Sequence, residues 1–497
     1  MKLKELIKAN PGLQYVADSL ELMSSAGRRV MLNTEFTADA TVLEAEWERT
    51  SLAIKAYVES GTRDAELTCC ECETPKSPTL NSKLRTPNSQ RSALTDLRHC
   101  LMQLHDLQGT LVSLRSHVPL NEVELFEVKN LAHLNRQSRT AIAELGLESA
   151  LPLPDLSEVF ALLDPDGTGL PSFYIYDSYD PRLPALRREL KALQISGDDP
   201  GRATVLAAEQ NNVQQEVCIR LSDRLHPYCN ILDTAMETLA YADLLLAKAE
   251  LSLRWGLTRP VVADGISYKG LFNPRLRDRN NELKLRYQTV DISLAPGACI
   301  ITGANMAGKT VLLKSVGTAQ QMVQLGMYAP ADEAHVMLVD DVVASIGDEQ
   351  DEMNGLSSFA SEIIKISNIV QRCRQERMLV LVDEPARTTN PVEGKALVQA
   401  LIGLLDKSSS LSLITTHYSQ LGCSCRRLRV RGFVENMCDM PLTPQNINRF
   451  IDYSLTEDDA DEVPQEALRI ATILGCDPAL LSAAREALPK FQLQVQH

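Results

Sequence analysis

Two different hydrophobic patterns divide this chain of 497 residues near residue 285. Before that point, apolar residues recur every three or four positions, as in LTDLRHCLMQLHDL from 94 to 107, which is the spacing of one helix face. After it, short apolar runs alternate with helical patterns, and ACIITG, RMLVLVDE and LSLITTH each end at a polar or glycine-rich turn. The pattern therefore predicts a largely α-helical first half followed by an α/β domain with a mostly parallel sheet.

The end of the helical half, from residue 185 to 256, is predicted to form long helices. One face of the second helix carries an apolar stripe made of Leu232, Met236, Leu239, Leu246, Ala249 and Leu253. This stripe predicts a long antiparallel hairpin, a build that can carry motion from one domain to another.

A segment of a different kind, LLDPDGTGLPSFYIYDSYD, interrupts the helices. Asp164, Asp166 and Thr168 stand at the first, third and fifth positions of a calcium-loop pattern. The twelfth position is Ile175, where such a loop needs a bidentate glutamate. The segment therefore predicts a tight turn that leads into a short strand, SFYIY, in place of a calcium site.

A stretch rich in Pro, Ser and Asn, residues 73–92, separates the first helices from the next helical pattern. Its composition predicts a surface loop, either simply solvated or used to dock a partner. Just before it, Cys69, Cys70 and Cys72 have no second, spaced partner pair of the kind that a structural zinc site needs, which favours unpaired thiols.

The patterns divide the chain into four regions. Residues 1–120 are predicted to form an N-terminal helical region that includes the polar loop, and residues 121–260 a helical core with the lever hairpin. Residues 261–435 are predicted to form the α/β domain, and residues 436–497 a C-terminal helical segment.

Composition is that of an ordinary globular protein, with 44% hydrophobic and 23% charged residues. The formal net charge of -15 argues against a protein that wraps nucleic acid, although a local basic patch remains compatible with it. The opening MKLKELIKANPG has no apolar core of signal-peptide length, and no stretch approaches the roughly 18 uncharged residues of a membrane helix. We therefore expect a cytoplasmic protein without a membrane partner.

The run ITGANMAGKT lies between an apolar strand and a helical pattern. It fits the phosphate-binding pattern G-x-x-x-x-G-K-[ST] with Gly303, Ala304, Asn305, Met306, Ala307, Gly308, Lys309 and Thr310. The glycines let backbone N–H groups turn toward the phosphates of ATP, and the following helix presents its positive end. Lys309 is expected to neutralise the β- and γ-phosphates, and the Thr310 hydroxyl to bind Mg²⁺.

The next two apolar strands end in groups that complete such a site. In MLVLVDE, Asp383 is expected to hold Mg²⁺ through water, and Glu384 to polarise the attacking water. His417, in TTHY, is placed to sense the γ-phosphate, and Tyr287 is a candidate for stacking on adenine. The chemistry predicted is hydrolysis of ATP to ADP and phosphate.

These motifs resemble the ABC-class P-loop ATPase of the MutS family. The family's loop carries the Asn-Met pair found here at Asn305 and Met306, and its TTHY is intact. The family's composite site borrows a serine-containing signature from the partner subunit, and SIGDEQDEMNGLSSFASEI resembles it with Gly355, Ser357 and Ser358. The resemblance implies a homodimer, and ALRIATILGCDPALLSAAREAL resembles the family's C-terminal dimerisation segment.

The departures from the family are also informative. After the strand-end acids, a glycine-rich stretch is replaced by PARTTN, with Pro385, Arg387 and Thr388, which puts communication between the two nucleotide sites in doubt. No N-terminal Phe-x-Glu mismatch wedge is evident, and IGDEQ and NPVEG resemble the reduced subfamily without a mismatch-recognition domain.

Two clients fit this resemblance. The first is DNA, in a mismatch-repair-like, DNA-dependent ATPase, a reading weakened by the net acidity and the missing recognition elements. The alternative is a protein, because some MutS-like proteins of reduced build resemble the ATPase part of reactivating factors for adenosylcobalamin-dependent amino-acid aminomutases. A nucleotide-regulated scaffold with little turnover is a third possibility, against which the intact Glu384 argues.

Overall fold

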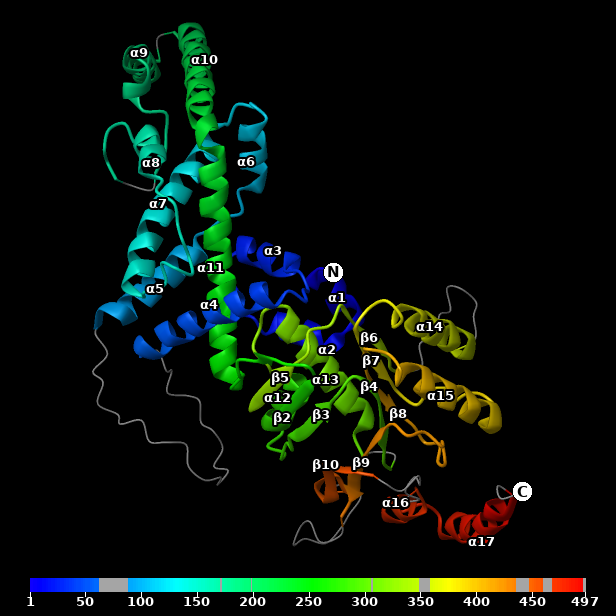
Figure 1. The fold of residues 1–497 in the computed structure, drawn as a ribbon. Coiled ribbons are helices and arrows are strands. Elements are labelled where there is room, and N and C mark those ends of the chain that lie inside the picture. The colour runs from blue at the N-terminus through cyan, green and yellow to red at the C-terminus, as the bar shows by residue number, and fades with distance from the viewer. Residues whose placement is uncertain are drawn as a thin grey trace.

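A helical arm projects from an α/β domain in the computed structural model (Figure 1). The structure describes residues 1–61, 88–169, 172–197, 199–304, 307–347, 358–434, 447–458 and 467–494. Cys69, Cys70 and Cys72, and most of the 73–92 loop, lie outside these ranges.

The first half is helical, as predicted. Four helices lie close to the α/β domain: α1 (Leu3–Ala9), α2 (Pro11–Asp18), α3 (Ser25–Asn33) and α4 (Ala40–Glu59). The arm continues with α5 (Asn88–Met102), α6 (Gln108–Arg115), α7 (Glu122–Glu144), α8 (Ser157–Leu163), η1 (Asp177–Tyr179), α9 (Leu183–Ser196), α10 (Pro200–Leu225), η2 (His226–Tyr228) and α11 (Cys229–Trp255). One large apolar cluster, mostly leucine, runs through these helices from Ala26 to Ala249.

The two long helices of the arm do not form the predicted hairpin. Helices α10 and α11 run end to end through η2, and together they make the long rod of the arm (Figure 1). Pro227 interrupts the α-helical hydrogen bonding, but His226 and Cys229 keep right-handed helical dihedral angles, so the chain does not turn back. The hairpin that does form pairs α9 with α10, after Gly197 ends α9 in a left-handed conformation.

The main sheet has the order β10-β9-β4-β8-β7-β6. Its strands are β4 (Gly297–Thr302), β6 (Asp341–Ser345), β7 (Met378–Val382), β8 (Leu411–Thr415), β9 (Arg426–Phe433) and β10 (Ile451–Glu457). All neighbouring pairs are parallel except β9 and β10, which confirms the prediction of a mostly parallel sheet.

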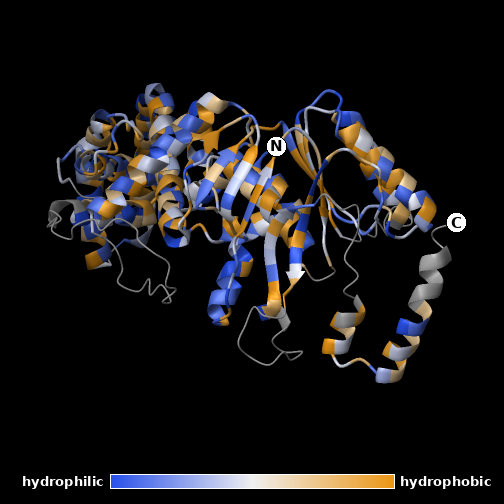
Figure 2. Ribbon diagram, turned by 60° about the horizontal axis from the view of Figure 1, so that its bottom comes forward, coloured by the Kyte–Doolittle hydropathy of each residue, from blue (hydrophilic) through white to orange (hydrophobic). Residues whose placement is uncertain are grey.

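Helices cover both faces of this sheet. Cys299 and Ile301 of β4 pack on the side of α13 (Lys309–Gln324), whereas Ala298 and Ile300 pack on the opposite side. That opposite side carries α14 (Ser358–Arg372) and α15 (Pro391–Leu405). Because successive strand residues point to opposite faces, a continuous apolar strand is what burial on both faces requires. Figure 2 shows hydrophobic residues, in orange, along the strands and on the helices of the α/β domain.

A second, smaller sheet flanks the domain in the order β1-β5-β2-β3. It is formed by β1 (Val261–Val262), β2 (Ile266–Leu271), β3 (Val290–Leu294) and β5 (Glu333–Val336), with α12 (Pro274–Glu282) between β2 and β3. The chain ends in η5 (Ile447–Phe450), β10, α16 (Ala467–Ile473) and α17 (Pro478–Gln494).

The predicted turn at Asp164 is present, but the strand after it is not. Residues 172–176 have no regular secondary structure. The side chains there serve a buried polar cluster, since Lys129 Nζ donates to Asp164, to the Ser172 carbonyl and to the Tyr176 hydroxyl. Asp164, the first residue of the apparent calcium pattern, therefore pairs with a lysine ammonium inside the core.

Among the described residues, no helix is both long enough and apolar enough to cross a bilayer. The eight cysteines within the same residues are all free thiols. No group of three or more His, Cys, Asp and Glu side chains that could hold a metal ion occurs within the described ranges.

Candidate active site

Three of the predicted site residues lie at one edge of the main sheet. Strand β8 pairs in parallel with both β4 and β7, so the carboxyl ends of these three strands are neighbours. Lys309 follows the β4 loop, Asp383 follows β7, and His417 follows β8. The ends of parallel strands meet at one edge, which is where open α/β sheets bind ligands.

Two glycines of the loop after β4 have backbone angles that suit a cradle at the start of a helix. Gly303 and Gly308 have φ angles of 145° and 80°, which favour glycine. Ala304 and Ala307 are buried, and α13 begins at Lys309. Asn305 and Met306, the pair that carried part of the family resemblance, lie outside the described residues.

Lys309 is the buried cation of this cradle. Its side chain is 6% exposed, and its ammonium donates to the carbonyls of Gly303 at 2.8 Å and Ala304 at 3.2 Å. The ammonium also lies 3.6 Å from a carboxylate oxygen of Glu384. A buried ammonium beside a helix N-terminus suits an anionic ligand such as a phosphate.

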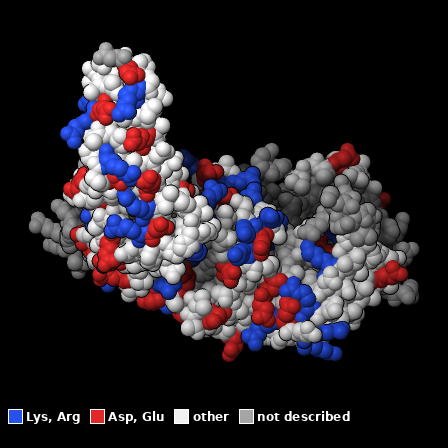
Figure 3. All heavy atoms as spheres, turned by 90° about the horizontal axis from the view of Figure 1, so that it is seen from above, with Lys and Arg blue, Asp and Glu red and all other residues white. Residues whose placement is uncertain are grey.

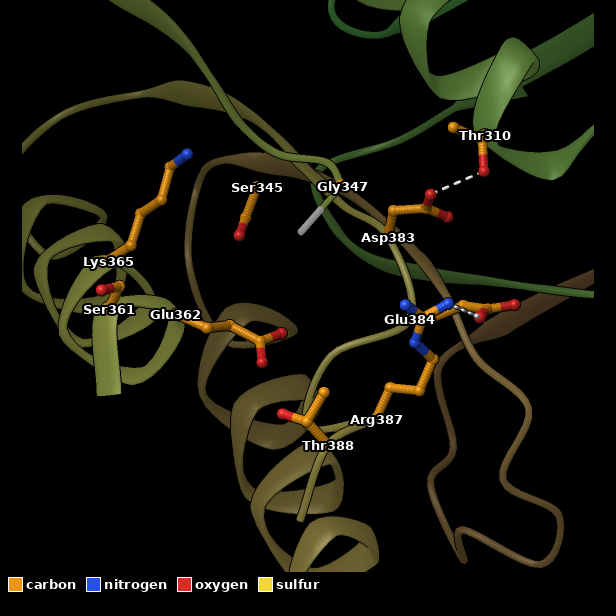
Figure 4. Close-up of a pocket in the computed structure, with 10 residues that line it drawn as sticks. All are labelled: Thr310, Ser345, Gly347, Ser361, Glu362, Lys365, Asp383, Glu384, Arg387 and Thr388. Atoms are coloured by element: carbon orange, nitrogen blue, oxygen red, sulfur yellow. Dashed lines mark hydrogen bonds and ion pairs between the residues drawn. The ribbon is translucent and has the colours of Figure 1, made fainter. Parts of the chain in front are cut away.

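Thr310 and Asp383, the two predicted metal ligands, lie in direct contact (Figure 4). The Thr310 hydroxyl donates to Asp383 Oδ2 at 2.6 Å, and the Thr415 hydroxyl donates to Oδ1 at 2.6 Å. A carboxylate beside a hydroxyl fits Mg²⁺, which usually takes one or two protein oxygens and completes its shell with phosphates and water.

Glu384 extends from a backbone held in an unusual conformation. Its φ is 46°, and that of Ala386 is 59°, in the left-handed region that costs a residue other than glycine about 1 kcal/mol or more. The Glu384 N–H donates to the Thr415 hydroxyl at 2.9 Å. The Glu384 carboxylate lies between two cations, Lys309 at 3.6 Å and Arg387 at 3.9 Å.

His417 lies within electrostatic reach of this group. Desolvation lowers the pKa of its imidazole below 6.5, and the positive charges of Lys309 and Arg387 add to this effect, although Glu384 opposes it. The ring is therefore mainly neutral at pH 7, and it packs against the ring of Tyr418 at a centroid distance of 4.2 Å. A neutral imidazole can both donate and accept a hydrogen bond at a phosphate oxygen.

A cavity of about 270 Å³ opens beside the two acids (Figure 4). Thr310, Asp383 and Glu384 line one side of it. Ser361 and Lys365 of α14 line another. Of the predicted signature, Gly355 and Ser357 lie outside the described residues, and Ser358 is described only as the first residue of α14.

The aromatic side chain beside the cradle is Tyr453, from β10. A Cβ atom placed on Gly308 would come within 3.0 Å of the Tyr453 ring. Tyr287 instead accepts a hydrogen bond from the Asn273 N–H at 2.7 Å, and its ring packs on the cluster formed by the first helices. Sequence reasoning missed Tyr453 because only the antiparallel return of β10 along β9 brings it to the loop.

Comparison with known proteins gives one family and several relatives. Residues 299–492 match the family MutS domain V. Over 208 residues the chain is 30% identical to the DNA mismatch repair protein MutS of Thermus aquaticus, covering 42% of this chain and 25% of that protein. It is 33% identical over 216 residues to Endonuclease MutS2 of Pediococcus pentosaceus, covering 42% and 26% respectively. The matched part therefore spans about a quarter of the length of these relatives.

Proposed function

Because the chain belongs to the MutS family through residues 299–492, we propose that it binds ATP with Mg²⁺ and hydrolyses it at the ends of β4, β7 and β8. The observation that carries this proposal is the convergence of Lys309, Asp383 and Glu384 at one edge of the sheet. They supply a phosphate cation, a metal-binding carboxylate and a candidate base, which are the parts that phosphoryl transfer requires.

Each residue has a role in this proposal. The backbone from Gly303 to Thr310 surrounds the phosphates, and Lys309 exchanges the carbonyls of Gly303 and Ala304 for phosphate oxygens. Thr310 and Asp383 would hold Mg²⁺, which would supply positive charge to offset the negative charge on the phosphates. Glu384 orients the attacking water, and a neutral His417 contacts the γ-phosphate.

We assign the contact with the nucleotide base to Tyr453 in preference to Tyr287. Its ring already lies against Gly308, whereas the Tyr287 hydroxyl is engaged by the backbone at Asn273. Base stacking on an aromatic ring is tolerant of geometry and needs only an accessible face.

We also propose that the active form is a homodimer. The signature residues Gly355, Ser357 and Ser358 would then complete the site of the partner subunit. The C-terminal helices support this proposal, because Leu474 and Leu480 expose 43% and 64% of their surface beside the domain that would dimerise. Leu474 follows α16 and Leu480 lies in α17, so both belong to the segment that resembles the family's dimerisation region.

DNA is the client that we propose, following the mismatch-repair relative. Acidic and basic side chains are interspersed along the arm on the face shown in Figure 3. We therefore expect the electrostatic attraction between this face and DNA to be limited. The protein-client alternative, a reactivated aminomutase, remains a prediction from the sequence.

The test is the steady-state rate of ATP hydrolysis with and without duplex DNA, at about 50 and 200 mM salt. We expect hydrolysis that DNA stimulates at low salt and much less at high salt, because phosphate contacts release counterions. Lys309→Ala should abolish turnover in every condition. The matched control is Lys314→Ala, which removes an exposed lysine one turn further along α13. Equal rates with and without DNA at both salts would exclude DNA as the client.

A further inference from the structure

The backbone of Ala386 is held from two sides. Its N–H donates to Oε1 of Glu362 at 3.2 Å, and its carbonyl accepts a hydrogen bond from the Tyr418 hydroxyl at 3.1 Å. Glu362 belongs to α14, and Tyr418 follows His417 after β8. In Figure 4 the Glu362 side chain reaches from α14 into the cavity that the loop after Asp383 borders.

The loop needs such restraint because its backbone is strained. Glu384 and Ala386 both have φ angles in the left-handed region, at 46° and 59°. Glycine would adopt this conformation without steric cost, but alanine and glutamate adopt it only where surrounding contacts impose it. Pro385, between them, has no N–H with which to anchor the loop.

Neighbouring residues are arranged to allow these contacts. Gly394, in the first turn of α15, lies so close that a Cβ atom there would come within 2.3 Å of the Tyr418 hydroxyl and 3.0 Å of the Ala386 carbonyl. Glycine at this position therefore leaves room for the hydrogen bond. Burial and the negative charge of Glu362 raise the pKa of Tyr418, which keeps its hydroxyl protonated as a donor.

We propose that Glu362 and Tyr418 are positioning residues for Glu384: by fixing the Ala386 peptide in its left-handed conformation, they aim the Glu384 carboxylate at the water that attacks ATP. This inference rests on the proposed ATPase function. Neither residue has a part in binding the phosphates, which falls to Lys309 and the loop before it. The two residues thus affect the rate of ATP hydrolysis and do not affect the binding of ATP.

The kinetic test compares Glu362→Ala with Glu362→Gln. The alanine variant removes the acceptor, and we expect kcat to fall about tenfold with KM for ATP unchanged, as for the loss of one charge-assisted hydrogen bond. The glutamine variant keeps an acceptor oxygen and should retain most of the rate. Tyr418→Phe should resemble the alanine variant. Glu393→Ala removes an exposed carboxylate from the first turn of α15 and serves as the matched control.

A second substitution tests the role of strain. In the Glu362→Ala background, Ala386→Gly should restore part of kcat, because glycine takes a φ near 59° without the hydrogen bond to hold it. Purely additive effects of the two substitutions on kcat would contradict the proposal.

Amide hydrogen exchange at Ala386 supplies a readout that does not depend on turnover. We expect exchange at this amide to be at least tenfold faster in Glu362→Ala than in the unmodified protein, and unchanged in Glu362→Gln. Unaltered exchange in Glu362→Ala, or a raised KM with normal kcat, would overturn the positioning role. If the unmodified protein hydrolysed no ATP while exchange responded as expected, the proposed function would fail separately from the restraint on the loop.

Discussion

Asp164 shows how the helical arm accommodates a buried charge. Its side chain is 3% exposed and lies 3.0 Å from the wholly buried Lys129 ammonium. Burial alone would raise the pKa of Asp164, but the Thr168 hydroxyl, the Gly169 N–H and the Lys129 charge outweigh it. Together they lower the pKa from 3.8 to about 2. The folded protein therefore favours the ionised carboxylate.

Substitution of Asp164 tests this coupling. At neutral pH, Asp164→Asn should lower the free energy of unfolding by about 3 kcal/mol, because it leaves Lys129 buried without its counter-charge. Since the folded pKa is depressed, the contribution of Asp164 is present above its ordinary value of 3.8 and is lost as the pH falls toward about 2.

Urea unfolding at pH 7 and pH 3 measures the difference in the free energy of unfolding between Asp164→Asn and the unmodified protein. We expect this difference to narrow at the lower pH. A gap of the same size at both pH values would mean that Asp164 does not act through its charge. Asp166→Asn, an exposed acid in the same turn, is the control.

The sequence predicted the positions of some residues and missed those of others. Gly303 follows a strand and Gly308 precedes a helix, so local spacing was enough to predict the elements on either side of the cradle. Tyr453 and Glu362 lie against the backbone of distant residues, Gly308 and Ala386, and no spacing pattern encodes such contacts. The left-handed Ala386 was hidden for the same reason, since alanine rarely adopts that conformation.

Among the elements, the rod of α10 and α11 departs most clearly from what the sequence predicted. The apolar stripe on α11 is buried as predicted over most of its length, but the stripe says only that a partner exists. It does not say whether that partner is the preceding helix. Pro227 lies in the short η2 turn between the two helices, and a proline near the start of a helical turn needs no change of direction.

Helix α11 also contacts the end of the helix that starts at the cradle. Lys248 Nζ donates to Glu46 of α4 at 2.7 Å and to the carbonyls of Leu325 and Gly326 at 3.4 and 3.3 Å. These carbonyls follow the last residue of α13, where a cation is favourable for the helix dipole. One buried lysine thus joins α4, α11 and α13.

Removing that lysine should weaken the junction of the three helices. Lys248→Met keeps the length of the side chain but removes the nearer cation from the largely buried Glu46, which keeps Arg49 at 3.4 Å and the Tyr241 hydroxyl. We expect a loss of about 3 kcal/mol in the free energy of unfolding. Equilibrium urea unfolding measures it. Lys55→Met on the exposed face of α4 is the control, and equal stability of the two variants would contradict a structural role for the junction.

At the scale of the whole molecule, a series of helices in contact joins the cradle to the tip of the arm. Helix α13 begins at Lys309 and ends beside Lys248, and from there α11 and α10 run to the far end of the arm (Figure 1). Rigid helices in direct contact are a physical route for a change at the proposed nucleotide site to reach a distant surface. The four predicted regions of the chain, and the dimer, remain predictions.

The rate of ATP hydrolysis by Glu384→Gln tests the proposed ATPase site most directly. Single-turnover hydrolysis and the Kd for ATP should be measured side by side for this variant and the unmodified protein. We predict that ATP binding persists, because Lys309 and Thr310 are intact, while the hydrolysis rate falls by about a hundredfold or more. Unimpaired hydrolysis by the glutamine variant would contradict the assignment of Glu384 as the group that orients the water, and with it the site proposed for this chain.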